Sequence, residues 1–164
     1  FMTRNLEYKR SCHEGSTHIP LIVSGGAYKD MGRTDRLVSL IDLPPTLLTA
    51  AGIDVPENFD GIALQSGTER DCVFAQISES HNGRCVITEK YTYSISSGLN
   101  YSTDKYRDDY LYDREKDRGE RRNLINSPAY AKEKEKLRGL LVREMLKAGE
   151  SAPVIKRRLF KGNI

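Results

Sequence analysis

The sequence predicts an α/β protein whose C-terminal part is α+β. Three observations favour this class. A continuous apolar run at residues 19–23 has the character of a strand buried on both faces. Residues 72–113 alternate in polarity and are rich in β-branched and aromatic residues, which is typical of an antiparallel sheet. Apolar residues recur at helical spacing within residues 128–148, which indicates an amphipathic helix.

The first piece, residues 1–68, is expected to form the end of an α/β domain. A polar segment, "EYKRSCHEGSTH", leads into a strand predicted over residues 17–24. The apolar run inside this strand predicts that both of its faces are covered. A glycine-rich turn, "GGAYKDMG", follows the strand.

A short helix is predicted over residues 43–51. Asp42 is a suitable N-cap, and the pair of prolines after Leu43 fits only in a first helical turn. Gly52 fits the C-terminal stop. The side chains expected to point inward are Leu47, Leu48 and Ala51.

The second piece, residues 69–150, is expected to form a small antiparallel sheet packed by a helix. A first strand near residues 72–78 has three apolar side chains on one face, namely Val73, Ala75 and Ile77. A hairpin that turns at Glu89-Lys90 follows, and "DYLYD" is a further short strand.

A helix over residues 128–148 completes this piece. Ser127 is a typical N-cap before a first-turn proline, and Gly149 closes the helix. One stripe of the helix is formed by Tyr130, Leu137, Leu141, Met145 and Ala148. The basic tail, residues 151–164, has no clear periodicity and is expected to be unstructured.

The composition excludes several function classes. A net charge of +3 over 164 residues is too small to indicate a nucleic-acid partner. No apolar run approaches the roughly 20 residues of a membrane span. The three cysteines include no CxxC pair, so neither a disulfide framework nor a zinc ribbon is predicted. The sequence does not indicate a cellular compartment.

Cys12, His13 and His18 bring metal-binding and nucleophilic side chains into one short segment. They could hold a metal ion or form a thiolate nucleophile with its base. A metal site needs three or four ligands at compatible spacing, and the sequence has no second cluster. A nucleophilic cysteine needs a base in the folded site, which adjacency in the sequence does not supply. No metal site is therefore predicted, and a small, semi-buried Cys12 is favoured.

Two further positions are candidates for substrate binding. Lys9 and Arg10 form a cationic pair, which is either solvated surface charge or a clamp for a sulfate or phosphate oxygen. His81 belongs to "ESHNGR", residues 79–84, at the tip between two predicted strands. Loops at strand ends often carry sites, and a plain connecting loop is the simpler interpretation.

Four consecutive stretches resemble C-terminal signatures of the sulfatase family, within the alkaline-phosphatase-like superfamily. They are "KRSCHEGSTHIPLIVSGG", "VSLIDLPPTLLTAAGIDVPENFDGIAL", "GRCVITEKYTYSI" and "LYDREKDRGERRNLINSP". Their order and spacing match from about residue 5 to residue 148. The resemblance implies the end of a sulfatase-type α/β domain, followed by a small subdomain with an antiparallel sheet and a helix packed on it. The chain thus resembles a C-terminal fragment of a sulfatase.

The resemblance also implies a role for the polar segment. In the family, the lysine of a K-x-x-x-x-E-G-x-x-x-x-P pattern reaches the sulfate group of the substrate, and this pattern is matched by Lys9, Glu14, Gly15 and Pro20. Lys9 is therefore the candidate catalytic residue and also a candidate substrate-binding residue. His13 and His81 are the other candidates for substrate binding. His13 stands where the family more often has an aromatic residue.

The resemblance places the cofactors outside this chain. The family's nucleophile is a formylglycine made from the cysteine or serine of a C/S-x-P-x-R motif, and this sequence has no such motif. The family's calcium ligands would lie upstream of Phe1. We therefore expect no cofactor and no turnover in this fragment, and calcium and formylglycine in the parent. The expected partners are a small-molecule sulfate ester and the missing N-terminal domain.

Three functional hypotheses stay open. The parent is a sulfuric ester hydrolase, or it is a phosphodiesterase or phosphonate hydrolase of the same superfamily, or the chain is a purely structural, non-catalytic module. A C-x-P-x-R motif upstream would favour the sulfatase, and a bare threonine would favour phosphoryl chemistry. The sequence does not specify which sulfate ester is the substrate.

Overall fold

The residues described by the computed structural model are 10–29, 32–79, 81–98 and 104–157. Lys9 lies outside the described residues. The chain divides into two compact units. One unit joins residues 1–19 to residues 74–164, and the other is residues 20–73.

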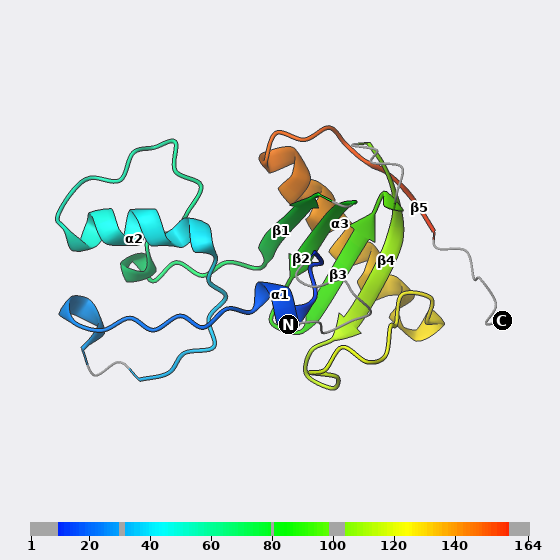
Figure 1. The fold of residues 1–164 in the computed structure, drawn as a ribbon, viewed down its shortest axis with the longest axis horizontal. Helices are drawn as coiled ribbons and strands as arrows, with labels where there is room; N and C mark the ends of the chain where they lie inside the picture. The colour runs from blue at the N-terminus through cyan, green and yellow to red at the C-terminus, as the bar shows by residue number, and fades with distance from the viewer. Residues whose placement is uncertain (1–9, 30–31, 80, 99–103, 158–164) are drawn as a thin grey trace. The chain divides into compact units, whose positions relative to one another are not determined.

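The larger unit is built on a five-stranded sheet with the order β1-β2-β3-β4-β5 (Figure 1). Its strands are β1 (Val73–Ser78), β2 (Asn82–Ile87), β3 (Tyr91–Ser96), β4 (Lys105–Asp113) and β5 (Val154–Lys156). β2 and β3 pair antiparallel, as do β3 and β4, whereas β5 pairs parallel with β4. The predicted small sheet followed by a helix is confirmed.

The hairpin predicted to turn at Glu89-Lys90 is confirmed, with Ile87 opposite Thr92 next to the turn. Thr88 closes the turn on itself. Its backbone N–H donates to the Tyr91 carbonyl at 2.9 Å, and its hydroxyl accepts the Tyr91 N–H at 2.9 Å. These bonds satisfy the backbone groups where the strand ladder ends.

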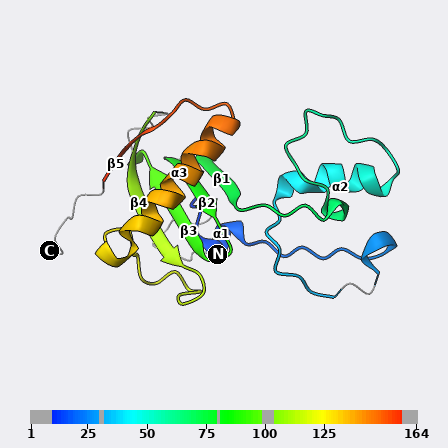
Figure 2. The ribbon, with the colours of Figure 1, turned by 180° about the vertical axis from the view of Figure 1, so that it is seen from behind.

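The C-terminal helix crosses one face of the sheet (Figures 1 and 2). α3 spans Ala131–Lys147 and follows a single 3-10 turn, η5 (Pro128–Tyr130). Its buried side chains belong to the predicted stripe and are Leu137, Leu141 and Met145. Gly149, with a φ of 80°, ends the helix as predicted. Neither α3 nor any other helix within the described ranges is long and apolar enough to cross a membrane.

A buried carboxylate fixes α3 on the sheet. Asp108 in β4 accepts hydrogen bonds from the Tyr93 hydroxyl at 2.7 Å and from the Arg138 guanidinium at 2.9 and 3.0 Å. Lys134 Nζ lies 3.4 Å from the same carboxylate. Burial raises the pKa of Tyr93 well above its usual value, so its hydroxyl stays protonated and donates. The charge of Asp108 is thus compensated by the helix that it holds.

The prediction that the basic tail, residues 151–164, is unstructured is wrong for part of it. Val154, Ile155 and Lys156 form β5 and pair with Lys105 to Arg107 at the edge of β4. The Val154 N–H also donates to the Asp104 carbonyl at 2.7 Å. β5 has no alternation of apolar and polar residues that would predict a strand. It forms because the edge of β4 offers backbone donors and acceptors to pair with.

The smaller unit consists of short helices and loops. Its helical elements are η1 (Gly26–Tyr28), η2 (Leu40–Asp42), α2 (Leu43–Ala50) and η3 (Leu64–Ser66). Asp42 is 1% exposed, and its carboxylate accepts the backbone N–H groups of Ser39 and Ile62, each at 2.8 Å. It also pairs with Arg70. Asp42 was predicted to cap α2, but its side chain joins the loops around the helix and forms no cap bond.

The helix predicted after Asp42 is confirmed, but two of its three predicted inward residues are wrong. Leu47 is 69% exposed and Ala51 is also exposed, whereas Leu48 is partly buried. The buried side chains of α2 are Pro45 and Thr46. The Thr46 hydroxyl donates to the Asp42 carbonyl at 2.6 Å and accepts the Leu64 N–H at 2.9 Å. Polar contacts with the following loop therefore decide which face of α2 is covered within this unit.

The strand predicted over residues 17–24 is wrong. Thr17 ends the short helix α1, and the described residues between it and β1 form no strand. The apolar run is not buried. Ile22 is 90% exposed, and Ile19, Leu21 and Val23 are exposed as well. A strand is stable when neighbouring strands accept and donate its backbone hydrogen bonds, and no described strand pairs with this run.

The packing of α3 predicts the effect of shortening Leu141, which is fully buried. Leu141→Ala should lower the free energy of unfolding by about 2–5 kcal/mol, because it removes apolar contacts and leaves a cavity. The matched control is Leu146→Ala, since Leu146 is on the same helix and 51% exposed; its effect should stay within about 0.5 kcal/mol. Urea denaturation measures both values, and equal effects of the two variants would contradict the packing described.

Candidate functional site

The segment before α1 lies on the face of the sheet opposite α3 (Figures 1 and 2). α1 is a single turn, Glu14–Thr17, that begins after His13. The His13 carbonyl accepts the N–H groups of Ser16 at 2.8 Å and Thr17 at 3.1 Å, and the Thr17 hydroxyl at 3.2 Å. Three local bonds to one carbonyl therefore hold the turn that follows the polar segment.

Cys12 anchors this segment in a buried cluster with Cys85, Tyr110 and Tyr112. Burial raises the pKa of the Cys85 thiol well above its usual value, and a hydrogen bond with Cys12 adds to the shift. Burial likewise raises the pKa of Tyr110 well above its usual value. Because the Cys85 thiol stays protonated, it is a packing residue and not a thiolate nucleophile.

The His13 imidazole stacks on the same cluster. Its ring centroid lies 4.2 Å from that of Tyr110, with an interplanar angle of 24°, and 5.8 Å from that of Tyr112. His13 is 7% exposed. Stacking on Tyr110 and a tilted contact with Tyr112 restrict the ring at the point where the polar segment meets α1.

The segment that leads into α1 forms one wall of the site. The other wall is the signature loop, which we define as residues 113–124. Polar side chains of this loop accept hydrogen bonds from backbone N–H groups in and next to the loop. The Asp117 carboxylate accepts the Arg122 N–H at 2.7 Å. The Asn123 amide oxygen accepts the N–H of Leu111 at 3.1 Å and of Ile125 at 3.0 Å. These side chains fix the loop in place of a regular helix or strand.

Glu120 joins the signature loop to α1. Its carboxylate accepts the Glu14 N–H at 3.0 Å, and its own N–H donates to the Asp117 carbonyl at 2.9 Å. Glu120 is 3% exposed and has a φ of 50°, in the left-handed region that a side chain other than glycine rarely adopts. The surrounding contacts maintain this conformation, which directs the carboxylate toward α1.

The Glu14 carboxylate connects α1, through Arg114, to the β2–β3 turn. One oxygen lies 2.8 Å from His18 Nδ1, and the other lies 3.6 Å from the Arg114 guanidinium. Arg114 also donates to the Thr88 carbonyl at 2.6 Å. Glu14 is therefore engaged by a histidine and an arginine of its surroundings.

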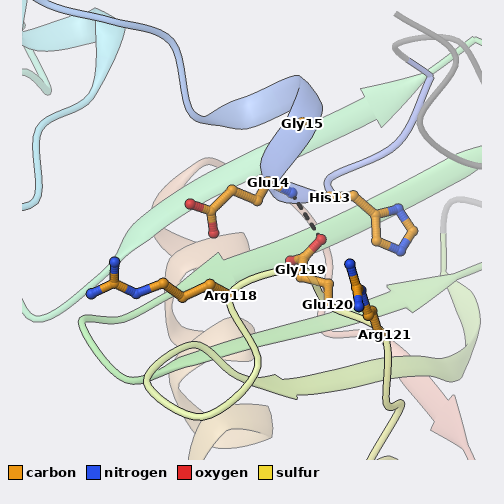
Figure 3. Close-up of a pocket in the computed structure, with 7 residues that line it drawn as sticks. All are labelled: His13, Glu14, Gly15, Arg118, Gly119, Glu120 and Arg121. Carbon is orange, nitrogen blue, oxygen red and sulfur yellow. Dashed lines mark hydrogen bonds between the residues drawn. The ribbon is translucent and has the colours of Figure 1, made fainter.

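An open pocket of about 550 Å³ lies between α1 and the signature loop (Figure 3). Its lining residues are His13, Glu14, Gly15, Arg118, Gly119, Glu120 and Arg121. Figure 3 shows the side chains of Arg118 and Arg121 on either side of Glu120. The pocket thus combines an imidazole, two guanidinium groups and two carboxylates.

The three residues predicted to bind substrate differ in their placement. His13 lines the pocket. His81 directly precedes β2 and is not among the described residues that line it. Lys9 lies outside the described residues, so its position relative to His13 is limited only by the chain between them. The roles of all three residues stay predictions.

The contribution of the signature loop was not predicted. Its sequence, "DREKDRGERRNL" (residues 113–124), indicates a charged loop, although Arg118, Glu120 and Arg121 line the pocket. Glu120, within the stretch "LYDREKDRGERRNLINSP" that resembles a sulfatase signature, was the signal that could have indicated the contact with α1. Arg10, considered as a solvated charge, forms an exposed ion pair with Glu79 at 3.2 Å.

Residues 5–147 match the family described as N-sulphoglucosamine sulphohydrolase, C-terminal. The chain belongs to this family of sulfatase C-terminal domains. The resemblance of its four sequence stretches to sulfatases is thereby confirmed. The pocket and the signature loop both lie within the matched range.

Among curated sulfatases, arylsulfatase K of Xenopus laevis is 44% identical over 57 residues. This alignment covers 35% of the chain and 11% of that protein. The chain therefore spans only a small part of the curated relatives that it matches.

Solved structures show the same fold. A 2-O GAG sulfatase is 31% identical, with a TM-score of 0.58, covering 66% of this chain and 24% of that chain. The phosphonate monoester hydrolase of Agrobacterium radiobacter is 22% identical, with a TM-score of 0.56, covering 70% of this chain and 26% of that chain. At 22% identity, the likeness to the phosphonate monoester hydrolase shows the fold alone.

The Glu120 contact predicts a stability effect at the site. Glu120→Ala should lower the free energy of unfolding by about 1–3 kcal/mol, because the Glu14 N–H loses its acceptor in a partly buried position. Glu120→Gln keeps an acceptor oxygen and should cost less. Glu115→Ala, in the same loop, is the control: its exposed pair with Lys90 at 3.2 Å should contribute less than about 1 kcal/mol.

Urea denaturation of the three variants tests this ranking. Equal effects of Glu120→Ala and Glu115→Ala would show that the Glu120 contact contributes nothing specific to the fold of the site.

Proposed function

We propose that this chain is part of an enzyme that hydrolyses sulfate esters of small molecules. The observation that carries the proposal is the match of residues 5–147 to a family of sulfatase C-terminal domains. The chain spans 11% of the first curated relative and 24% of the solved 2-O GAG sulfatase. The activity is therefore proposed for a whole protein of which this chain supplies one wall of the substrate pocket.

In this proposal Lys9 neutralises charge on the sulfate group. A lysine ammonium is a compact point charge, which suits an oxygen that gains negative charge in the transition state. The structure supports a rigid segment next to Lys9. Cys12 is buried in the sheet cluster and His13 stacks on Tyr110, so the chain three residues after Lys9 is anchored.

His13 and His81 are proposed as further contacts to the substrate. His13 supports this role by lining the pocket between α1 and the signature loop. His81 lies in the β1–β2 connection, and Glu79 of that connection pairs with Arg10. The ion pair brings the connection next to the segment that carries Lys9, which supports a shared site.

Calcium and formylglycine are expectations for the whole protein, and the residues of this pocket do not fit calcium. The two carboxylates that line it belong to Glu14 and Glu120, and each already accepts hydrogen bonds from the protein. Arg114, Arg118 and Arg121 stand beside them, so a divalent cation would meet like charges. The chain has no C/S-x-P-x-R motif that could supply formylglycine.

The rest of the protein is proposed to cover the smaller unit. Within residues 20–73, several large apolar side chains are exposed, including Ile22, Leu40, Ile41, Leu47 and Ile53. Exposed apolar groups in this number mark a surface that another element covers. The family resemblance assigns that element to an N-terminal domain.

The alternative function is hydrolysis of a phosphonate or phosphodiester. The fold of the phosphonate monoester hydrolase of Agrobacterium radiobacter supports it, at 22% identity. The identity of the nucleophile in the whole protein separates the two proposals. Turnover of aryl phosphonates above aryl sulfates by that protein would favour the alternative.

This chain alone should release no sulfate from 4-nitrophenyl sulfate, with or without added calcium. The reason is that its sequence contains no formylglycine motif, so the expected nucleophile is absent. The measurement is sulfate and nitrophenol release by the purified chain. Calcium-dependent turnover well above a boiled-protein control would contradict this prediction.

In the whole protein, Lys9→Ala should lower kcat/KM about 10²–10³-fold, because a charge opposite the sulfate oxygen contributes roughly 3–4 kcal/mol to the transition state. Lys9→Arg should restore activity only in part, because the guanidinium is longer and planar. Steady-state kinetics with one sulfate ester measures both variants.

Arg10→Ala is the matched control. Arg10 pairs with Glu79 at the surface, so its loss should change kcat/KM by less than about threefold. If Arg10→Ala abolished activity and Lys9→Ala did not, the match of Lys9 to the family pattern would be wrong by one residue.

A further inference from the structure

We propose that Cys12 and Cys85 are a site of reversible oxidation, at which a small-molecule disulfide converts their two thiols into a Cys12–Cys85 disulfide that fastens the segment before α1 to the sheet. Both residues hold thiols in the structure. The proposal concerns this chain alone and does not depend on the proposed function.

The two thiols are neighbours inside one buried cluster. Cys12 is 4% exposed and Cys85 is 0% exposed, and both pack with Tyr110 and Tyr112. The Cys85 thiol is close enough to Cys12 to share a hydrogen bond with it. A disulfide requires two cysteines whose side chains are directed toward each other. Thiols that share a hydrogen bond already have this arrangement.

The third cysteine does not belong to this pair. Cys72 is buried within residues 20–73, the smaller unit, whereas Cys12 and Cys85 belong to the larger unit. Among the described residues, the cluster around Cys12 and Cys85 does not include Cys72. One specific pairing is therefore expected, and Cys72 serves as an internal control.

The topology gives this pairing a large effect. The larger unit is discontinuous, because it joins residues 1–19 to residues 74–164. Cys12 lies in the first piece and Cys85 in the second. A bond between them would join the two pieces covalently and close a loop that contains the whole smaller unit. Closing a long loop restricts the unfolded chain strongly, so the disulfide stabilises the folded one.

The segment that carries Cys12 is otherwise held by few contacts. His13 stacks on Tyr110 at 4.2 Å between ring centroids, and the Glu14 N–H donates to the Glu120 carboxylate at 3.0 Å. α1 is a single turn, and no described strand pairs with the segment. A short segment with few anchors opens locally more often than the sheet beneath it. Such an opening uncovers both thiols.

The oxidation takes place in the open state. In the closed state, burial keeps the Cys85 thiol protonated and excludes the oxidant. After opening, the Cys12 thiolate attacks one sulfur of oxidised glutathione, which forms a mixed disulfide and releases one glutathione thiolate. The Cys85 thiolate then attacks the Cys12 sulfur, and the second glutathione thiolate leaves. The two cysteine protons pass through water to the two glutathione thiolates. Two cysteine thiols are thus oxidised while one glutathione disulfide is reduced, and excess reduced glutathione reverses the reaction.

The first experiment identifies the bond in the unchanged chain. The purified chain is equilibrated with mixtures of oxidised and reduced glutathione, quenched with acid, unfolded and alkylated with N-ethylmaleimide. The reduced chain has three cysteines and should take up three maleimides, and the oxidised chain should take up one. Peptide mapping should find the remaining maleimide on Cys72 and a peptide containing Cys12 linked to one containing Cys85. The matched variant C72S should oxidise as the unchanged chain does.

Each other outcome of this experiment contradicts the proposal. Uptake of three maleimides from the most oxidising mixture would show that the pair does not react. A disulfide that includes Cys72, or glutathione retained on Cys12, would show that Cys12 and Cys85 do not close. None of these results depends on a variant that has to fold.

The second experiment tests the fastening of the segment. The melting temperature of the oxidised chain should exceed that of the reduced chain by at least about 5 °C. The amides of Ser16 and Thr17, which donate to the His13 carbonyl, should exchange hydrogen at least tenfold more slowly after oxidation. C85A given the same oxidising treatment should show neither change. A Cys12–Cys85 disulfide that left both quantities unchanged would overturn the fastening role.

The third experiment tests the opening step through the rate of disulfide formation. E120A removes an anchor of the segment and should form the disulfide at least threefold faster than the unchanged chain. E120Q removes the same charge but keeps an acceptor oxygen, so its rate should stay below that of E120A. E115A, in the same loop, should react as the unchanged chain does. An E120A rate no higher than that of E120Q or E115A would overturn the opening step.

Discussion

The candidate site depends on one hydrogen bond between distant parts of the chain. The Glu14 N–H donates to the Glu120 carboxylate at 3.0 Å, across 106 residues of sequence. Without it, the turn after the polar segment and the signature loop would be two separate surface features. With it, the segment containing His13 gains a second anchor besides its packing on Tyr110. The pocket exists because these two anchors hold its opposite walls.

Much of the larger unit could be predicted because its signals are local and its partners lie nearby in sequence. The β2–β3 hairpin follows from alternation around a short turn, and α3 from its apolar stripe. The smaller unit could be predicted less well. Its α2 was located correctly, but Leu47 is exposed, because the contacts that cover the helix are polar bonds made by Thr46. The apolar run after α1 looked like a buried strand, yet burial requires neighbours that its own sequence cannot specify.

The site could be predicted only in part for the same reason. His13 stood out as a titratable side chain in a polar segment, and it lines the pocket. Arg118 and Arg121 did not stand out, because a run of charges in a loop is usually solvated. They line the pocket next to Glu120, whose backbone conformation and long-range bond are tertiary features. The assignment of Lys9 depends on the family pattern alone, so its role stays a prediction.

The parallel pairing of β5 with β4 has a consequence for how the chain behaves in solution. β4 is nine residues long, and β5 covers three of them, Lys105 to Arg107. An uncovered strand edge offers a row of backbone donors and acceptors to any extended chain that approaches it. The short, basic β5 occupies part of that edge with a peptide of the same molecule. A chain ending at Gly149 would leave this stretch open to strand addition from a second molecule, so β5 protects this part of the edge of β4 from self-association.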